Sequence, residues 1–268
     1  MPRANRHFIP GQIWHITHRC HQRDFLLNLL KDRQNWVSWL HEAKLRHGIT
    51  VFNYVVTSNH IHLLLFDNCG QGAIPKAIQL IAGRTAQEYN HRKVRKGAFW
   101  EDRYHATAVE AESHLLRCLV YIDLNMIRAG VVSHPAEWPC GGYREIQSPK
   151  RKGPIIAYEH LAEKAGFKTY EEFRAAHEGW VNEALANDRN YRQSEWTESV
   201  AVGSEAFNLG IKERLGVRAL GRKVLNTSES NSELREPMAR YINENDTEMA
   251  DIGQENRYFL EIYPTILV

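Results

Sequence analysis

Residues 49–66 read ITVFNYVVTSNHIHLLLF. The stretch contains two largely apolar runs, Ile49–Val56 and Ile61–Phe66, separated by the polar triplet Thr57-Ser58-Asn59. Short runs that are rich in β-branched and aromatic residues and bounded by turn residues are typical of strands. The stretch therefore predicts two consecutive strands joined by a short turn.

The sequence on either side alternates between strand-like and helix-like periodicity. We expect two further strands over residues 13–18 and 104–109, and helices over residues 29–47, 74–91 and 112–129. Gly48 and Gly130 stand where the first and third helices should end, a position that favours glycine. The order β-α-β-β-α-β-α predicts an α+β fold, in which helices cover a ferredoxin-like antiparallel sheet.

After about residue 150, the alternating strand-like and helix-like segments are replaced by short helical segments. We expect residues 1–150 to form the main domain, residues 151–225 a helical C-terminal region, and residues 226–268 an acidic, partly disordered tail. The expected helices of the second region are 158–165, 169–185 and 204–215, with Thr169 and Ser204 as N-caps. In the tail, Asn226 to Asn256 is rich in Asn, Ser and Glu and resembles a loop, whereas Tyr258 to Tyr263 is apolar enough to dock on a surface.

The composition indicates a globular protein of 268 residues, 43% of them hydrophobic and 25% charged. No run approaches the ~18 apolar residues that a membrane-spanning helix needs, and the polar start of the chain predicts no secretory signal. The four cysteines are widely spaced and form no C-x-x-C pair. We therefore expect neither a disulfide framework nor a zinc–cysteine site, and a reducing cytoplasm fits best.

Charge is distributed unevenly along the chain. Residues 1–150 hold 19 Lys and Arg against 12 Asp and Glu, whereas residues 226–268 hold 3 against 9. A basic first half suggests a polyanionic partner, although charge alone favours the simpler explanation of an unevenly charged, solvated surface. The acidic tail, if tethered near that surface, is expected to compete with the polyanion for it; a tail that merely solvates the chain, or whose end adds a strand to the sheet edge, is the alternative.

Three groups of residues have side chains suited to chemistry or binding. His60 and His62 are two positions apart on a predicted strand, so both imidazoles project from one face and form the beginning of a divalent-metal site. The same H-x-H pair is also compatible with one exposed histidine and one that is hydrogen-bonded in the core.

Tyr121 and Asn125 lie one turn apart on the helix predicted over residues 112–129, so they share a helix face. A phenol can act as a covalent nucleophile, and the Asn125 side chain offers an oxygen ligand to a metal. The competing interpretation places the tyrosine ring in the core and bonds the asparagine to backbone.

The third group is the stretch HRKVRKGAFWEDRY, residues 91–104. Its cationic side chains are suited to phosphates, and Trp100 is suited to stacking on an unpaired base. The candidate nucleic-acid-binding residues are Arg92, Lys93, Arg95, Lys96, Trp100 and Arg103. A solvated loop beside core aromatics explains the stretch equally well.

Taken in order, three motifs resemble those of the single-tyrosine HUH transposases, and most closely the REP-associated tyrosine transposases. The motifs are VVTSNHIHLL at 55–64, GAFWEDRY at 97–104 and YIDLNMIRAGVV at 121–132, and the resemblance covers roughly residues 8–145. The sequence departs from the family pattern at Thr57-Ser58, where many relatives have Met-Pro, and at Met126, where Pro is common. None of these departures falls on a residue with a chemical role.

The resemblance implies the fold predicted above and a set of roles. His60, His62 and Asn125 would bind Mg²⁺ or Mn²⁺, and Tyr121 would attack single-stranded DNA beside a hairpin to give a 5′-phosphotyrosine and a free 3′-OH. The implied protein is a cytoplasmic, nucleoid-associated DNA strand transferase, a monomer or homodimer, with no membrane partner and no small-molecule substrate. Two rivals are a catalytically inactive protein that binds hairpin nucleic acid and a metal hydrolase that activates water. The hydrolase needs a general base, and no carboxylate follows the H-x-H pair before Asp67.

Overall fold

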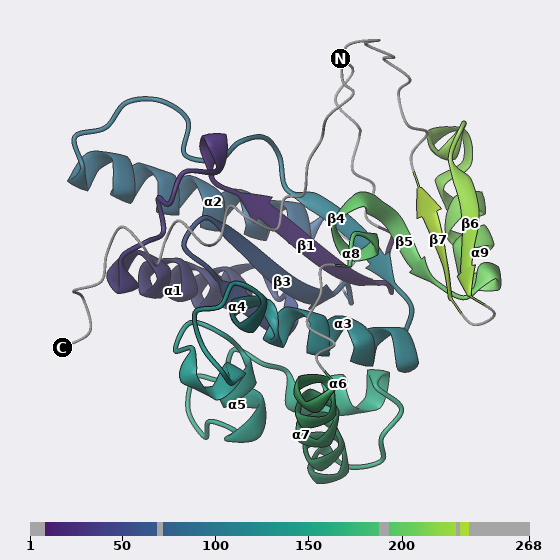
Figure 1. The fold of residues 1–268 in the computed structure, drawn as a ribbon. Helices are drawn as coiled ribbons and strands as arrows, with labels where there is room; N and C mark the ends of the chain where they lie inside the picture. Colours follow the sequence, from purple (N-terminus) through teal and green to yellow (C-terminus); the bar gives the residue numbers. More distant parts are fainter. Residues whose placement is uncertain (1–8, 69–71, 188–192, 229–230, 236–268) are drawn as a thin grey trace.

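The computed structural model describes residues 9–68, 72–187, 193–228 and 231–235, and its centre is a seven-stranded sheet of order β2-β3-β1-β4-β5-β7-β6 (Figure 1). The strands are β1 Ile13–Arg19, β2 Thr50–Val56, β3 His60–Phe66, β4 His105–Val109, β5 Ser199–Gly203, β6 Lys223–Ser228 and β7 Asn231–Arg235. Neighbouring strands are antiparallel except β4 and β5, which are parallel. The α+β fold and the four strands predicted in the first half are confirmed.

The hairpin of β2 and β3 is held by the side chain of Thr57. Its hydroxyl oxygen accepts hydrogen bonds from the backbone N–H groups of Asn59 and His60, at 3.3 and 3.0 Å, which closes the turn locally. Every residue of β2 is buried although β2 is the first strand of the sheet. Later chain covers this strand, through backbone bridges from Val51 to Ile156 and from Val55 to Gly141. This cover explains why the strand has an almost continuous apolar sequence instead of a clear alternation.

The helices are α1 Leu30–His47, α2 Ala73–Arg92, α3 Ser113–Asp123, α4 Asn125–Arg128, α5 Tyr143–Gln147, α6 Tyr158–Lys164, α7 Tyr170–Ala186, α8 Glu195–Glu198 and α9 Glu205–Leu215. Three short 3-10 helices are η1 His21–Arg23, η2 Pro135–Glu137 and η3 Gly216–Ala219. In Figure 1, α5, α6 and α7 lie below the sheet, and β6, β7 and α9 lie at its right-hand edge. Thr169 and Ser204 cap α7 and α9 as predicted, each accepting a backbone N–H at 3.2 Å.

The helix predicted over residues 112–129 is not continuous, and that part of the prediction is wrong. It breaks at Leu124 (φ −78°, ψ 3°), which separates α3 from α4. In an unbroken helix the carbonyl of Tyr121 accepts the N–H of Asn125. Here that carbonyl accepts a hydrogen bond from Nη2 of Arg128 at 2.6 Å, so a side chain competes for the backbone acceptor at the break.

A buried polar network fixes Asp123, the last residue of α3. Its carboxylate accepts hydrogen bonds from Asn53 Nδ2 at 2.9 Å and from His177 Nε2 at 2.8 Å. Gln147 Nε2 lies 3.0 Å from the other ring nitrogen of His177, so both nitrogens of this buried ring have a partner. Strand β2 and helix α7 therefore hold the end of α3 in place.

The expectation of a loop from Asn226 onward is wrong for the described part of that segment. Residues 223–228 and 231–235 form the hairpin of β6 and β7, and β7 pairs with β5. Most of its buried residues are polar: Ser232 accepts a hydrogen bond from Asn208 Nδ2 at 2.6 Å, and Glu233 accepts one from Ser199. Leu234 is the buried apolar residue of β7, so the strand carries little apolar alternation for sequence reasoning to detect. The expectations for residues 236–268, including Tyr258 to Tyr263, lie outside the described residues.

Two other expectations concern cysteines and membranes. Cys20, Cys118 and Cys140 are buried free thiols, and Cys69 lies outside the described residues. Burial raises the pKa of the Cys20 thiol to about 12. None of the helices in the described ranges is long and apolar enough to cross a bilayer.

Gly142 packs directly against the Asn53 that holds Asp123. Its N–H donates to the carbonyl of Tyr54 at 2.8 Å, and a Cβ placed on Gly142 would overlap Asn53 Oδ1. Gly83, in the middle of α2, is the natural contrast, because a Cβ there meets no heavy atom within 4 Å.

We predict that Gly142→Ala lowers the free energy of unfolding by about 1–3 kcal/mol, the usual cost of overpacking a tight interior. The control, Gly83→Ala, should leave stability unchanged or raise it by about 0.5–1 kcal/mol, because alanine is the better helix former. Urea unfolding of both variants measures the difference. Equal stability of the two variants would contradict the packing described for Gly142.

Candidate catalytic and metal-binding site

One face of the central strands carries most of the polar side chains of the site. Because β1 and β3 pair with Thr17 opposite His62 and Arg19 opposite His60, strand alternation places His15, Thr17, His60 and His62 on the same face. Asn53 of β2 and the α3–α4 segment also lie on this side, since Asn53 bonds Asp123 and Asn125 bonds His62. The site is therefore formed where the break between α3 and α4 crosses the central strands.

The two histidines of the H-x-H pair lie side by side. Their ring centroids are 5.1 Å apart and the ring planes are nearly perpendicular, at 82°. His62 is buried, with 2% of its surface exposed, whereas His60 is partly exposed at the end of β3. His60 Nδ1 donates to Asn59 Oδ1 at 2.7 Å, so the lone pair of this ring is on Nε2. One ring of the pair is thus rigidly enclosed and the other reaches toward solvent.

Tyr121 and Asn125 both reach His62, although they lie on opposite sides of the helix break. Asn125 Nδ2 donates to His62 Nε2 at 3.0 Å. The ring centroid of Tyr121 is 5.8 Å from that of His62, and the two rings meet edge to face at 84°. The structure therefore brings together all four residues that the sequence assigns to chemistry: His60, His62, Tyr121 and Asn125.

Arg128 belongs to the same site and was given no role by sequence reasoning. Its guanidinium lies 4.1 Å from the centroid of the Tyr121 ring, within cation–π distance, while it also binds the carbonyl of Tyr121. Burial lowers the pKa of Arg128, and the neighbouring Tyr121 partly offsets this effect. The one-turn spacing from Asn125 to Arg128 in YIDLNMIRAG was the available sequence signal, since positions three apart share a helix face.

His15 is the second residue that sequence reasoning missed. It is fully buried, and its ring stacks on that of His62 at 5.0 Å between centroids and 8° between planes. Burial lowers the pKa of His15 to about 3, so the ring is neutral at physiological pH. Burial also holds the pKa of His62 well below its usual value. The alternating strand WHITHR contained the signal, because it predicts His15 and Thr17 on one face.

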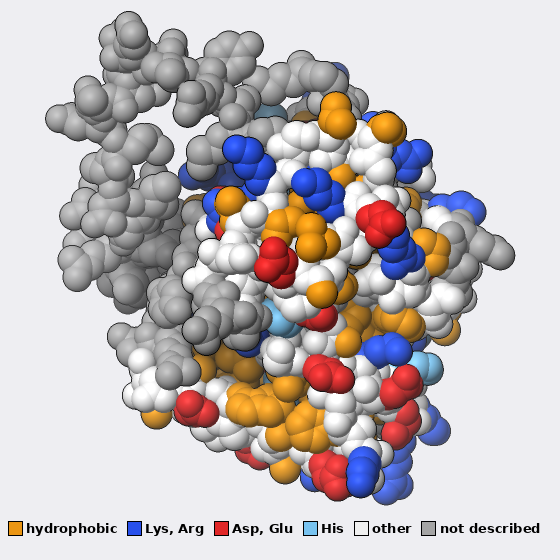
Figure 2. All heavy atoms as spheres, turned by 90° about the vertical axis from the view of Figure 1, so that its right-hand side faces the viewer, with side chains coloured by type: hydrophobic (Ala, Val, Ile, Leu, Met, Phe, Trp, Pro, Cys, Tyr) orange, Lys and Arg blue, Asp and Glu red, His pale blue; other side chains and the backbone are white. Residues whose placement is uncertain are grey.

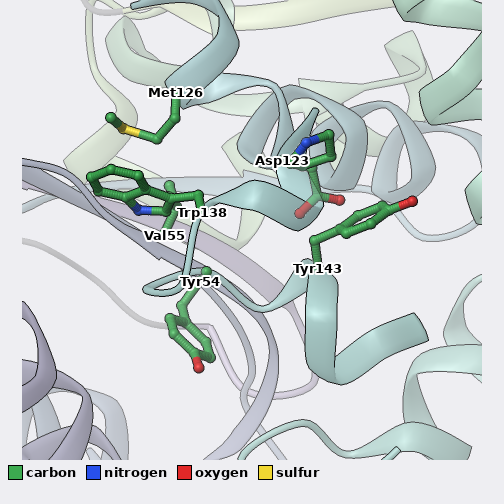
Figure 3. Close-up of a pocket in the computed structure, with 8 residues that line it drawn as sticks. Tyr54, Val55, Asp123, Met126, Trp138 and Tyr143 are labelled. Carbon is green, nitrogen blue, oxygen red and sulfur yellow. The ribbon is translucent and has the colours of Figure 1, made fainter. Parts of the chain in front are cut away.

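A small pocket lies behind the helix break, but it is separate from these residues. Figure 3 shows Trp138, Val55 and Met126 on one side of it and Asp123 and Tyr143 on the other, with the Tyr54 ring pointing away. The Asp123 carboxylate in this pocket is already bonded to Asn53 and His177. The pocket therefore reflects packing around the end of α3, and we assign no chemistry to it.

The predicted nucleic-acid-binding residues are near the site but not in it. Trp100 stacks on His18 at 4.1 Å between centroids and donates to the carbonyl of Ala82 in α2. Since His18 alternates with Thr17 along β1, Trp100 lies on the sheet face opposite His62. It lies at the same end of the sheet, however, because Cys20 bridges to Trp100 and bonds the carbonyl of Asn59.

The cationic side chains of residues 91–104, called the basic run below, form two groups: some bind other residues of the protein and others are exposed to solvent. Arg92 pairs with Asp32, and Arg95 donates to the carbonyl of Ala98 at 2.9 Å, so both help to shape the end of α2. Lys93, Lys96 and Arg103 are exposed. Figure 2 faces the side of the molecule with β6, β7 and α9, and there cationic and anionic side chains are interspersed. The exposed cations Lys93, Lys96 and Arg103 are the more suitable group for phosphates.

The candidate metal ligands are two imidazoles and one amide. Within the described ranges, no three His, Cys, Asp or Glu side chains converge as a metal cluster would. Two imidazole nitrogens and an amide oxygen are donors that suit a divalent ion, and in this structure the Asn125 amide turns its N–H toward His62 Nε2. Imidazole nitrogen suits manganese better than magnesium, which prefers oxygen.

Comparison with known proteins found one family model and several solved structures that resemble this chain. Two of these structures are a REP-associated tyrosine transposase bound to a REP hairpin (18% identity, 57% of this chain and 90% of that one, TM-score 0.44) and a transposase candidate from Deinococcus radiodurans (17%, 40% and 85%, TM-score 0.32). No curated protein matches the sequence. Residues 10–125 match the family model of IS200-like transposases.

Proposed function

We propose that this protein cleaves single-stranded DNA beside a hairpin and rejoins the strands, with Tyr121 as the nucleophile. The observation that carries the proposal is the position of Tyr121, whose ring lies against both His62 and the Arg128 guanidinium in a chain whose residues 10–125 match a transposase family model. A structural tyrosine needs no such arrangement of imidazole and cation around its ring.

The proposed step exchanges one phosphodiester for another. The phenol oxygen of Tyr121 forms a bond to the scissile phosphorus and its proton passes to water, while the bond from phosphorus to the 3′ oxygen breaks. The products are a 5′-phosphotyrosine and a strand ending in 3′-OH, which can reverse the step on another end. No energy source is needed, because a phosphoester bond is formed for each one broken.

Arg128 gives this site a fixed positive charge. Its guanidinium is held by the Tyr121 carbonyl and lies over the Tyr121 ring, so it is positioned before any substrate arrives. A phosphate that approaches the phenol brings negative charge into a partly dry environment, where a preorganised cation is most effective. Arg128 therefore serves two purposes in the proposal: it orients the nucleophile and attracts the scissile phosphate.

His60, His62 and Asn125 would hold a divalent ion, Mn²⁺ or Mg²⁺. Such an ion, when bound, stabilises the negative charge that develops on the phosphate oxygens. For this purpose the Asn125 amide has to turn its oxygen toward the ion in place of the N–H that it now offers to His62. The substrate is expected to be a DNA hairpin with adjacent single-stranded sequence, bound partly by Lys93, Lys96 and Arg103.

Tyr121→Phe is the decisive substitution. We predict that it abolishes the covalent protein–DNA adduct and strand cleavage but changes hairpin binding by less than about twofold, because only the hydroxyl is removed. The measurement is denaturing electrophoresis of labelled hairpin DNA incubated with protein and Mn²⁺. The matched control is Tyr89→Phe in α2, which should cleave like the parent.

The same assay separates the proposal from its rivals. Hairpin binding by the parent protein without any adduct would favour a catalytically inactive binding protein, and cleavage without an adduct would favour a metal hydrolase. Full cleavage by Tyr121→Phe would assign the nucleophile to another group.

His60→Ala tests the metal site with little effect on the core, because His60 is only partly buried. We predict at least a tenfold loss of Mn²⁺ affinity in DNA-free protein, as expected when one of three ligands is removed, with an unchanged melting temperature. Titration calorimetry and thermal unfolding measure the two quantities. His91→Ala, an exposed histidine of α2, is the control and should bind Mn²⁺ like the parent. Unchanged affinity in His60→Ala would remove this residue from the site.

The exposed lysines of the basic run should contribute mainly through phosphate contacts. We predict that Lys93→Ala combined with Lys96→Ala weakens hairpin binding and lowers the slope of log affinity against log salt by about 0.7 per lost contact. Lys152→Ala with Lys168→Ala removes the same charge from a distant surface and should leave the slope unchanged. Identical slopes for the two double variants would mean that the run is merely solvated.

A further inference from the structure

A chain of three hydrogen bonds links the C-terminal part of the protein to the H-x-H pair. His15 Nδ1 lies 2.9 Å from the carbonyl oxygen of Trp196, and His15 Nε2 lies 2.9 Å from His62 Nδ1. His62 Nε2 in turn lies 3.0 Å from Asn125 Nδ2. Each ring nitrogen of the two buried histidines therefore has one partner in the chain.

The chemistry of the first partner fixes the direction of every bond. A carbonyl oxygen can only accept, so His15 Nδ1 must carry a hydrogen. His15 has no exposed surface, and a second ring hydrogen would bury an imidazolium whose neighbours are a carbonyl and another imidazole; its Nε2 therefore carries the lone pair and accepts from His62. His62 Nδ1 is then the donor, and the lone pair of His62 is on Nε2. The N–H of the Asn125 amide, which points at that nitrogen, is the complementary group.

We propose that His15 is a positioning residue for His62. Because His15 donates its Nδ1–H to the Trp196 carbonyl, its Nε2 accepts a hydrogen bond from His62 Nδ1, and His62 therefore presents the Nε2 lone pair toward Asn125. The metal-binding consequence rests on the function proposed above, whereas the tautomer itself does not. Histidine ligands in metal sites typically donate their other N–H to a neighbouring acceptor, which fixes the ring and its tautomer. In this protein the acceptor is the His15 imidazole, and the orientation of that ring is fixed by its hydrogen bond to the Trp196 carbonyl.

The carbonyl belongs to a segment outside the matched family region, which ends at residue 125. Trp196 is fully buried in α8, where its ring lies 6.1 Å from that of Tyr121 and its Nε1 donates to Gln193. Thr107 of β4 donates to the carbonyl of Ser199 at 2.7 Å, which ties the end of this turn to the sheet. The segment of α8 and β5, residues 195–203, thus forms part of the site, in addition to extending the sheet.

Arg117 fastens the same segment to α3. It pairs with Glu195 at 2.7 Å and donates to Asn231 Oδ1 at 2.9 Å, while its guanidinium lies 5.7 Å from the Trp196 ring. The helix that carries Tyr121 therefore also holds the segment that supplies the carbonyl. This arrangement couples the placement of the nucleophile to the orientation of His62.

The test uses metal-free, isotope-labelled full-length protein and reads the tautomer of each histidine from two-bond proton–nitrogen correlation spectra, with His62 assigned by comparison with His62→Gln. The parent should show His62 protonated at Nδ1. His15→Phe, which keeps the ring volume but removes both nitrogens, should shift His62 toward the other tautomer and weaken Mn²⁺ binding about tenfold to a hundredfold. His15→Gln, whose side-chain oxygen can replace Nε2 as acceptor, should restore the parent tautomer and most of the affinity.

The outcomes separate this inference from the proposed function. His62 protonated at Nε2 in the parent, or an unchanged His62 tautomer in His15→Phe, would overturn the relay whatever the protein does with DNA. Should His15→Phe fail to fold, the spectra of the parent and of His15→Gln still decide. The expected tautomers combined with no Mn²⁺ binding by the parent would support the relay and overturn the metal site instead.

Discussion

The register of β1 against β3 is the constraint on which the site depends. Thr17 lies opposite His62 and Arg19 opposite His60, and this pairing sets the face on which every imidazole of the site projects. A slip of one residue would turn the side chains of one strand to the opposite face and would separate His15 from His62. The apolar side chains on the other face, such as Ile16 and Leu63, are completely buried and would lose their environment in the same slip. Hydrophobic burial therefore maintains the geometry of polar residues that add little to stability by themselves.

Burying so many polar groups is costly unless each one has a partner. The structure satisfies this requirement with linked networks: Trp196, His15, His62 and Asn125 form one, and Gln147, His177, Asp123 and Asn53 form another. The two networks meet at the break between α3 and α4, because Asp123 and Asn125 flank Leu124. The break is thus held from both sides, and it lets Tyr121 and Asn125 approach the same histidine without a continuous helix.

The sequence was sufficient to predict the elements that have a clear apolar period. The strands of the first half, the ends of α1 and α2, and the capping roles of Thr169 and Ser204 all follow from local patterns of this kind. Local patterns could not reveal the break at Leu124, since it depends on Arg128 taking a carbonyl. They also missed β7, because its buried Ser232 and Glu233 are satisfied by side chains from distant elements. His15 was overlooked for a related reason: its partner Trp196 is 181 positions away, and no spacing rule covers that separation.

The 181 positions between His15 and Trp196 also affect the order in which the parts of the protein fold. Contacts between residues far apart in sequence carry a large loop-closure cost and tend to form after local ones. The β2–β3 hairpin and the neighbouring β1 can assemble as soon as about a quarter of the chain has left the ribosome, since domains fold as their residues emerge. Trp196 emerges much later, so a growing chain holds its histidines and its tyrosine before the group that orients them. Local opening of the same late segment in the finished protein would reverse only that last step and leave the central strands paired.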